Sequence, residues 1–286
     1  MSVSDHQQPD PRPVILITGC SSGIGLDTAE FFAKKDWHVL ATCRKDADVK
    51  RMQKAGFTSF RLDYEDQDSL DAVVPRLQQL TAGRIDVLFN NGAYAIPCLS
   101  EDLPTPALRQ IFEANFFGWH ELTRQILPLM FAAGGGRIIH NSSVLGFAAM
   151  RARGAYNATK FALEGLTDTM RQEITGTNVK LILVQPGPIR TRIRQNAYIQ
   201  FKRWITWKDS RQPNFYTKGL IPRLSAKETT KDLFELMPDA VTRAVWHAAT
   251  ARRPRLRYRI TWSTKLMAFA KRILSTRMMD KLASKF

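Results

Sequence analysis

Hydrophobic positions in the first two thirds of the chain follow two alternating periods. An apolar run with β-branched residues at 14–18 ends in a glycine-rich turn, and apolar residues then recur at helical spacing. The same alternation predicts further strands at 38–43, 59–62, 86–90, 137–141 and 179–185, and helices at 47–55, 67–80, 106–131 and 154–175. Strands separated by helices form parallel sheets that are covered on both faces. The pattern therefore predicts a doubly wound α/β domain.

The last third of the chain departs from this pattern. After Pro186-Gly187-Pro188, the segment 189–231 mixes aromatic and basic residues, which predicts a substrate-loop insertion over the sheet edge. The remaining pattern predicts a helix at 238–252, a seventh parallel strand at 256–261 and helical structure at 263–286. We therefore expect a disordered leader at 1–12, a single α/β domain at 13–262 and an amphipathic helical tail at 263–286.

Composition narrows the class of protein. With 44% apolar and 24% charged residues, the chain is typical of a globular protein. Three cysteines without a CxxC pair predict free thiols in a reducing compartment, hence a cytoplasmic location. Five histidines without an HxxxH pair argue against a metal site. The longest apolar run, 126–133, falls far short of the roughly 20 residues that span a bilayer.

The formal net charge of +16 is concentrated at one end of the chain. Residues 1–189 carry 19 Lys and Arg against 20 Asp and Glu, whereas residues 190–286 carry 23 against 6. Such asymmetry suggests an anionic partner, such as nucleic acid, a membrane surface or an acidic ligand. A solvated basic surface that only aids solubility explains it equally well.

The sequence TGCSSGIG at 18–25 lies between the first strand and the first helix. This is the position of a dinucleotide-binding (Rossmann) fingerprint. There Gly19 permits a tight turn, Gly23 lets the backbone approach a pyrophosphate and Gly25 allows close helix packing. Ser21, Ser22 and Ile24 add hydroxyl and amide donors.

A second motif is Tyr156-x-x-x-Lys160 in the helix predicted from residue 154. The two side chains lie on one helix face, where the ammonium would lower the phenol pKa from about 10 towards the range of an acid/base catalyst. Ser143 lies 13 residues upstream at the end of the fifth strand, and Asn115 lies in the preceding long helix. This conjunction is far more specific than any single member.

These residues resemble the short-chain dehydrogenase/reductase superfamily. The matching features are TGCSSGIG at 18–25, Asp63, NNGA at 90–93, Asn115, Ser143, Tyr156 with Lys160, and PGPIRT at 186–191. The resemblance covers about 13–262. In its finer sequence features the chain is similar to bacterial NADP-dependent aldehyde/ketone reductases of the retinol/17β-hydroxysteroid dehydrogenase-like branch. It implies hydride transfer between a nicotinamide and an apolar aldehyde, ketone or secondary alcohol.

The resemblance also implies a role for each residue. Tyr156 would exchange a proton with the substrate oxygen, which Ser143 would hold, while Lys160 would bind the nicotinamide ribose and Asn115 a water that relays the proton. Ser142 competes for the serine role, but the family interval selects Ser143. The residues that would bind cofactor are Gly19, Ser21, Ser22, Gly23, Ile24, Gly25, Arg44, Lys45, Asp63, Asn90, Gly92, Tyr156, Lys160, Pro186, Gly187, Ile189 and Thr191.

Cofactor choice depends on the end of the second strand. An NAD enzyme places an acid there for the ribose 2′-hydroxyl, whereas a cation suits the 2′-phosphate of NADP. Thr42 and Cys43 occupy the acid's position, and Arg44 and Lys45 follow, which favours NADP(H). The family usually has Asn-Asn-Ala-Gly where this chain has NNGA at 90–93, so we expect a local backbone adjustment without loss of binding.

The substrate is expected in an apolar cleft formed by Tyr94, Phe147 and Met150 beside Ser143 and Tyr156. An alternative function is a non-catalytic dinucleotide sensor whose basic third binds RNA or a protein. The four catalytic matches disfavour it, and no RRM-type or helix-turn-helix signature supports nucleic acid as a partner. By family analogy we expect a homodimer through the helices of Asn115 and Tyr156.

The tail is open to three interpretations. One helical face collects Leu266, Phe269, Ala270, Ile273 and Leu274, and after a break at Ser275-Thr276 a second collects Met278, Met279, Leu282 and Phe286. Basic amphipathic helices of this kind pack on their own domain, cover a cleft or dock a second subunit, or bind the surface of an anionic membrane. The last would place the enzyme peripherally on a membrane.

Overall fold

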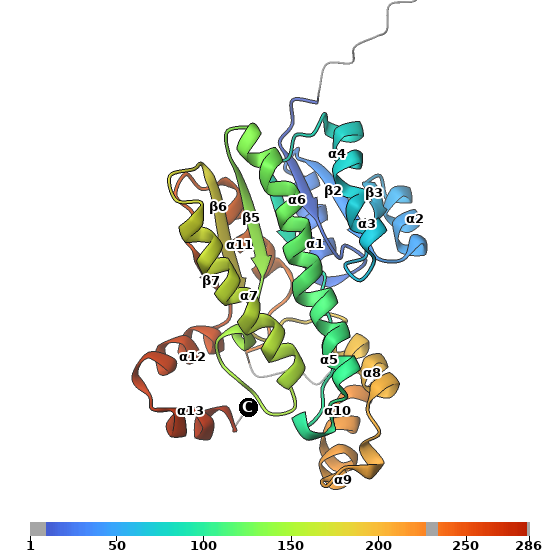
Figure 1. Cartoon of the computed structure of the whole chain (residues 1–286), viewed down its shortest axis with the longest axis vertical. Helices are drawn as coiled ribbons and strands as arrows, with labels where there is room; N and C mark the ends of the chain where they lie inside the picture. Colours follow the sequence, from blue (N-terminus) through green and yellow to red (C-terminus); the bar gives the residue numbers. More distant parts are fainter. Residues whose placement is uncertain (1–9, 227–233, 285–286) are drawn as a thin grey trace, which may run out of the picture.

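A computed structural model describes residues 10–226 and 234–284 and confirms the predicted fold. Seven parallel strands form one sheet in the order β3-β2-β1-β4-β5-β6-β7 (Figure 1). The strands are Val14–Ile17 (β1), His38–Cys43 (β2), Thr58–Arg61 (β3), Val87–Asn90 (β4), Gly136–Asn141 (β5), Val179–Gln185 (β6) and Arg257–Arg259 (β7). β7 covers only the middle of the predicted 256–261.

Helices cover both faces of the sheet and fill two apolar cores. The helices of the domain are Gly23–Ala33 (α1), Asp46–Lys54 (α2), Gln67–Asp71 (α3), Val73–Thr81 (α4), Thr105–Phe112 (α5), Gly118–Ala132 (α6), Gly154–Glu173 (α7) and Asp239–Thr250 (α11). Phe32 of α1, Met52 of α2 and Val245 of α11 pack on one face. Leu77 of α4 and Trp119 of α6 pack on the other. β1 is buried along its whole length because both of its faces are covered.

Two predicted helices are interrupted. The helix predicted at 67–80 is two helices, α3 and α4, separated at Ala72. Pro75 explains the break, since it has no N–H to donate to the carbonyl of Asp71. The helix predicted at 106–131 contains a π-helical turn, Glu113–Phe117, between α5 and α6. Asn115 lies inside that turn.

The C-terminal third adds two helical groups at one end of the sheet. The predicted insertion holds Ile193–Trp204 (α8), Pro213–Phe215 (α9) and Ile221–Ser225 (α10), and its residues 227–231 lie outside the described residues. The tail forms Trp262–Ile273 (α12) and Thr276–Ala283 (α13), with the break where it was predicted. In Figure 1 the two groups lie on either side of the lower ends of α5 and α7.

The tail packs on its own domain through only part of the predicted faces, namely Ala270 in α12 and Met279 with Leu282 in α13. Thr264, Met267 and Ala270 of α12 are buried, whereas Phe269 and Ile273 of the predicted face are exposed. Met267 packs against Val144 and Ala148, together with Met279 and Leu282 of α13. Phe286 lies outside the described residues. The periodicity was ambiguous because α12 carries apolar residues on two opposite faces.

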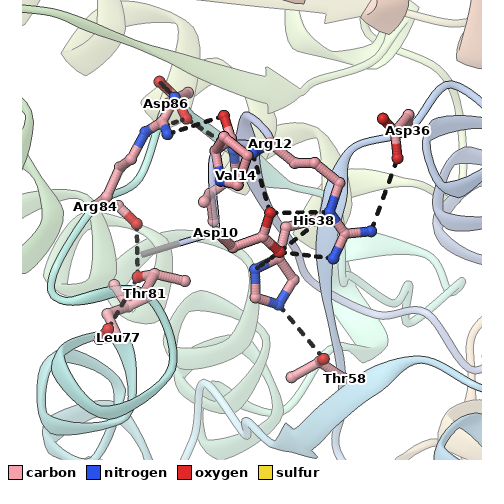
Figure 2. Close-up of polar contacts among 11 residues, drawn as sticks. Asp10, Arg12, Val14, Asp36, His38, Thr58, Leu77, Thr81, Arg84 and Asp86 are labelled. Carbon is pink, nitrogen blue, oxygen red and sulfur yellow. Dashed lines mark hydrogen bonds and ion pairs between the residues drawn. The ribbon is translucent and has the colours of Figure 1, made fainter. Parts of the chain in front are cut away.

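Polar contacts close the opposite end of the sheet, where the strands begin (Figure 2). Arg12 pairs with Asp10 at 2.6 Å and lies 3.9 Å from Asp36, and the carboxylate of Asp86 accepts from the N–H of Val14 at 2.7 Å. Residues 10–12 were predicted within a disordered leader, yet they hold these contacts beside β1. The rest of that leader, 1–9, lies outside the described residues.

Candidate active site

The sheet order reverses between β1 and β4, which opens a crevice at the carboxyl ends of the strands. A cavity of about 1310 Å³ occupies this end. Its walls come from the loops after β1, β2, β4, β5 and β6, from α8 and α10, and from α12 and the end of α13. The cavity is large enough for a dinucleotide together with a substrate.

The glycine-rich loop forms one wall of this cavity. Gly19 and Gly23 have φ values of +69° and +59°, which side chains other than glycine rarely adopt. A Cβ on Gly19 would lie 2.7 Å from Cα of Gly92, and one on Gly25 would lie 2.4 Å from the carbonyl oxygen of Gly19. The loop therefore leaves backbone N–H groups at the start of α1 open to an anionic ligand, as a pyrophosphate requires.

The end of β2 presents cations and no acid. Thr42 and Cys43 are buried, and the Thr42 hydroxyl donates to the carbonyl oxygen of Ile17 at 3.2 Å. Arg44 and Lys45 follow on the surface and line the cavity. This arrangement fits a 2′-phosphate better than a free ribose 2′-hydroxyl.

Tyr156 and Lys160 project from α7 into the cavity. The ammonium nitrogen Nζ of Lys160 donates to the carbonyl oxygen of Asn141 at 2.8 Å and lies 5.6 Å from the ring centroid of Tyr156. Burial raises the pKa of Tyr156 to about 12, although a hydrogen bond with Ser143 opposes the shift. The lowering expected from Lys160 is therefore not what shifts this pKa: desolvation dominates, the hydroxyl of Ser143 opposes it, and the phenol is protonated at neutral pH.

Lys160 is itself strongly perturbed. Its side chain is fully buried, with Nζ 4.0 Å from the ring centroid of Trp119. Burial lowers the pKa of Lys160 to about 7, while the charge of Glu164 opposes the shift. The nearby imidazole of His140 is neutral, because burial and the charge of Lys160 lower its pKa to about 3. Lys160 can thus change its charge near neutral pH.

The buried amine should leave a signature in stability. Between about pH 7 and about 10.5, the unfolded chain keeps the Lys160 proton that the folded chain has lost, so stability rises with pH there. Below about pH 7 both states are protonated and the difference is constant. We expect the free energy of unfolding of the wild type, relative to Lys160→Met, to increase across this window by more than about 1 kcal/mol. Denaturant titrations at pH 7 and 10 measure it, and a constant difference would contradict the shifted pKa.

Ser143 is placed to hold a substrate oxygen. It follows β5 with an extended backbone, and its hydroxyl oxygen accepts from the N–H of Leu145 at 3.1 Å. Its link to Tyr156 puts the two hydroxyls on the same side of the cavity. The hydroxyl of Ser142 is buried and has no hydrogen-bond partner among the described residues. Both serines line the cavity, and the choice of Ser143 by the sequence interval stays a prediction.

Asn115 stands behind the cavity wall. Its amide nitrogen donates to the carbonyl oxygen of Tyr94 at 2.8 Å, and its amide oxygen accepts from the N–H of Tyr94 at 3.1 Å. The side chain is fully buried and fixes the segment that carries Tyr94 into the cavity wall. Its predicted role in holding a water stays a prediction.

Most of the predicted site residues come together in this cavity. Those that line it are Gly19, Ser21, Ser22, Gly23, Ile24, Arg44, Lys45, Asp63, Gly92, Tyr94, Ser143, Met150, Tyr156, Lys160, Pro186, Gly187, Ile189 and Thr191. Of the remaining four, Gly25 packs against Gly19 as predicted and Asn115 lies behind the wall.

Asn90 and Phe147 also lie outside the lining. The carboxamide of Asn90 is buried and accepts from the hydroxyl of Tyr64 at 2.8 Å, and its neighbour Asn91 lines the cavity instead. Phe147 packs instead against the cluster of Val144, Ala148 and Met267, the last of which belongs to α12. Substrate contact by Phe147 therefore has no support in this arrangement.

The sequence analysis missed a set of arginines at the substrate end. The cavity is lined there by Arg151, Arg153, Arg190, Arg192, Arg194 and Arg223. Arg190 pairs with Glu235 at 2.9 Å, while Arg151 lies 4.4 Å from the ring centroid of Phe215. For the four arginines from Arg190 onwards the signal was present in the basic excess that begins at residue 190, whereas Arg151 and Arg153 lie before it.

Neither a metal site nor a membrane span is found in the described ranges. Within 10–226 and 234–284, no group of three His, Cys, Asp or Glu side chains is arranged to hold a metal ion. No helix in these ranges is long and apolar enough to cross a bilayer.

Comparisons with known proteins identify the family of the chain. The profile of the short chain dehydrogenase family matches residues 13–200. The uncharacterized oxidoreductase YbbO of Escherichia coli is 38% identical over 94% of this chain and 93% of its own length. The NADPH-dependent 3-dehydrocapnine reductase of Ornithobacterium rhinotracheale is 28% identical over 93% of this chain and 94% of its own.

The fold is shared with solved structures. A short-chain dehydrogenase from Streptomyces avermitilis superposes with a TM-score of 0.74 at 25% identity, over 92% of this chain and 96% of that one. The residues that the family profile matches make up most of the chain and include the glycine-rich loop and the Tyr/Lys pair. The chain belongs to the short-chain dehydrogenase family of dinucleotide-dependent oxidoreductases.

Proposed function

We propose that this protein transfers a hydride between NADP(H) and an apolar aldehyde, ketone or secondary alcohol. The observation that carries the proposal is that Ser143, Tyr156 and Lys160 line the same cavity as the glycine-rich loop and the Arg44-Lys45 pair. The three cysteines are buried and free, which favours a reducing compartment, and we place the enzyme in the cytoplasm on that argument.

The chain's own residues would supply binding and proton transfer. The nicotinamide, when bound, supplies or accepts the hydride. Ser143 would hold the substrate oxygen by a hydrogen bond, and the protonated phenol of Tyr156 would donate to it as the carbonyl is reduced. A phenol that stays protonated at neutral pH suits this direction. Lys160 would bind the ribose and complete the charge balance around the phenol.

A panel of aldehydes, ketones and alcohols tests the proposal. Turnover is followed by the absorbance of NADPH, and cofactor binding is measured separately by fluorescence titration. Turnover of an apolar carbonyl compound is the expected result. Tight NADPH binding without turnover of any panel member would instead favour the dinucleotide sensor, which the assembled catalytic residues disfavour.

The arginines at the substrate end refine the choice of compounds. The guanidinium of Arg151 stacks on Phe215 and donates to the side-chain oxygen of Gln212 at 2.7 Å, so both of these contacts are to uncharged groups. We expect fatty aldehydes with a terminal carboxylate or phosphate to show a KM about tenfold below that of the uncharged parent. Arg151→Gln should reduce this difference while leaving kcat for the parent unchanged. Equal KM values for both compounds in the wild type would rule the preference out.

A further inference from the structure

The outward face of α12 is apolar although solvent surrounds it. Trp262, Leu266, Phe269 and Ile273 recur at intervals of three and four residues and so share one helix face, which we call the outer stripe. The side chains of Trp262, Phe269 and Ile273 are 59%, 62% and 63% exposed. The helix is anchored through its opposite face, so packing on the domain does not explain the outer stripe.

An aromatic side chain from another segment extends the outer stripe. Phe234 lies beside Trp262, with ring centroids 5.5 Å apart, and both are exposed. Met237, which is 54% exposed, and Met278 of α13, at 53%, are further large apolar side chains open to solvent. Isolated exposed apolar residues are ordinary, but a continuous helical stripe of them marks an interaction surface.

Basic residues accompany the outer stripe. Lys265 and Arg272 lie along one edge of it, by the same helical periodicity. The other basic residues of the two tail helices are Lys271, Arg277 and Lys281, against a single acid, Asp280. Lys271 also donates to the carbonyl oxygen of Phe147 at 2.5 Å, which fixes α12 on the domain with its outer stripe facing away.

Charge complementarity selects the occupant of this surface. A second copy docked stripe to stripe would bring like charges together, whereas an anionic lipid surface pairs the cations and buries the aromatic and aliphatic side chains. Trp, Phe, Leu and Ile on one face with flanking Lys and Arg is the composition of a helix that lies in a membrane interface. We propose that the outer stripe of α12 binds the protein peripherally to anionic lipid bilayers.

The same helices border the cavity. Ser263 and Met267 of α12, with Ala283 and Ser284 at the end of α13, form part of its lining. A protein bound through the outer stripe would therefore hold one cavity wall close to the lipid. This placement suits an amphiphilic ligand, but binding to the bilayer is independent of the proposed reaction and is tested without turnover.

Sedimentation of the full-length protein with vesicles tests the proposal. Vesicles contain either phosphatidylcholine alone or an equal mixture with phosphatidylglycerol. We expect the wild type to sediment with the anionic vesicles at low salt and to be released at high salt. Phe269→Ser with Ile273→Ser should lower the partition coefficient at least about tenfold, since two large side chains lose their burial in lipid.

Matched variants separate the outer stripe from general effects. Phe131→Ser with Leu256→Ser removes two exposed apolar side chains elsewhere and should leave binding unchanged. Lys265→Gln with Arg272→Gln should weaken binding to anionic vesicles while leaving the folded state intact by circular dichroism. Failure of the wild type to sediment at low salt, or equal losses in both serine pairs, would overturn the proposal. So would conversion of a dimer to a monomer by Phe269→Ser with Ile273→Ser, measured by analytical ultracentrifugation, without any change in lipid binding.

Discussion

Tyr156→Phe should lower kcat by about 10²- to 10⁴-fold, because it removes the hydroxyl that we propose exchanges a proton with the substrate oxygen beside Ser143. The aromatic ring remains in place on α7 and keeps its apolar packing, so the fold should persist. Loss of the hydrogen bond with Ser143 should cost only about 1 kcal/mol of stability. NADPH affinity, measured by fluorescence titration, should change little, which separates lost chemistry from lost binding.

Tyr94→Phe provides the matched comparison. It removes a second phenol hydroxyl from the same cavity and should leave kcat within about tenfold of the wild type, since no proton transfer is assigned to it. A Tyr156→Phe enzyme that turned over a good substrate as fast as Tyr94→Phe does would show that Tyr156 is not the acid. Ser143 would then need a different partner in the cavity.

The fold could be predicted because its signals are local. The buried run of β1, the glycine-rich turn and the helical spacing of α1 each follow from a few neighbouring residues. The meeting of Ser143 with Tyr156 in one site followed from the family resemblance, which carries long-range information that periodicity lacks. The break before Pro75 was visible in principle, since proline interrupts a hydrogen-bond ladder.

The site details that escaped prediction depend on tertiary contacts. The carboxamide of Asn115 is hydrogen-bonded to the backbone of Tyr94, and that of Asn90 to the hydroxyl of Tyr64. A rule based on residue spacing encodes neither contact. The pKa of Tyr156 depends on how much water the fold excludes, and this desolvation raises the pKa where the Tyr/Lys spacing had predicted a lowering.

The orientation of α12 is a separate case. Because this helix has apolar residues on two sides, the periodicity of the sequence does not show which face packs on the domain. The small buried side chains Thr264 and Ala270 fit closely against the domain, whereas Phe269 and Ile273 remain outside. The close fit of the small side chains therefore set the orientation of α12, and the greater hydrophobicity of Phe269 and Ile273 did not.

Cofactor preference should follow from the residues after β2. An acid at the end of this strand would repel a 2′-phosphate, but the buried Thr42 and Cys43 occupy that position. Arg44 and Lys45 are exposed at the cavity edge, where charge-assisted contacts to a phosphate contribute about 1.5–3 kcal/mol. We therefore expect NADPH to bind at least about tenfold more tightly than NADH.

Arg44→Ala should remove most of that preference. It should weaken the binding of NADPH and change the binding of NADH little, because only NADPH carries the 2′-phosphate that the guanidinium would contact. Lys50→Ala is the matched control, since it removes an exposed cation from the adjacent α2 that does not line the cavity. It should leave both affinities unchanged apart from a small, salt-screened effect. Fluorescence titrations of both cofactors against the three proteins measure the result. Equal affinities for the two cofactors in the wild type would refute the assignment. An equal loss of affinity for both cofactors in Arg44→Ala would instead place this side chain beside a portion of the molecule that NADH and NADPH share.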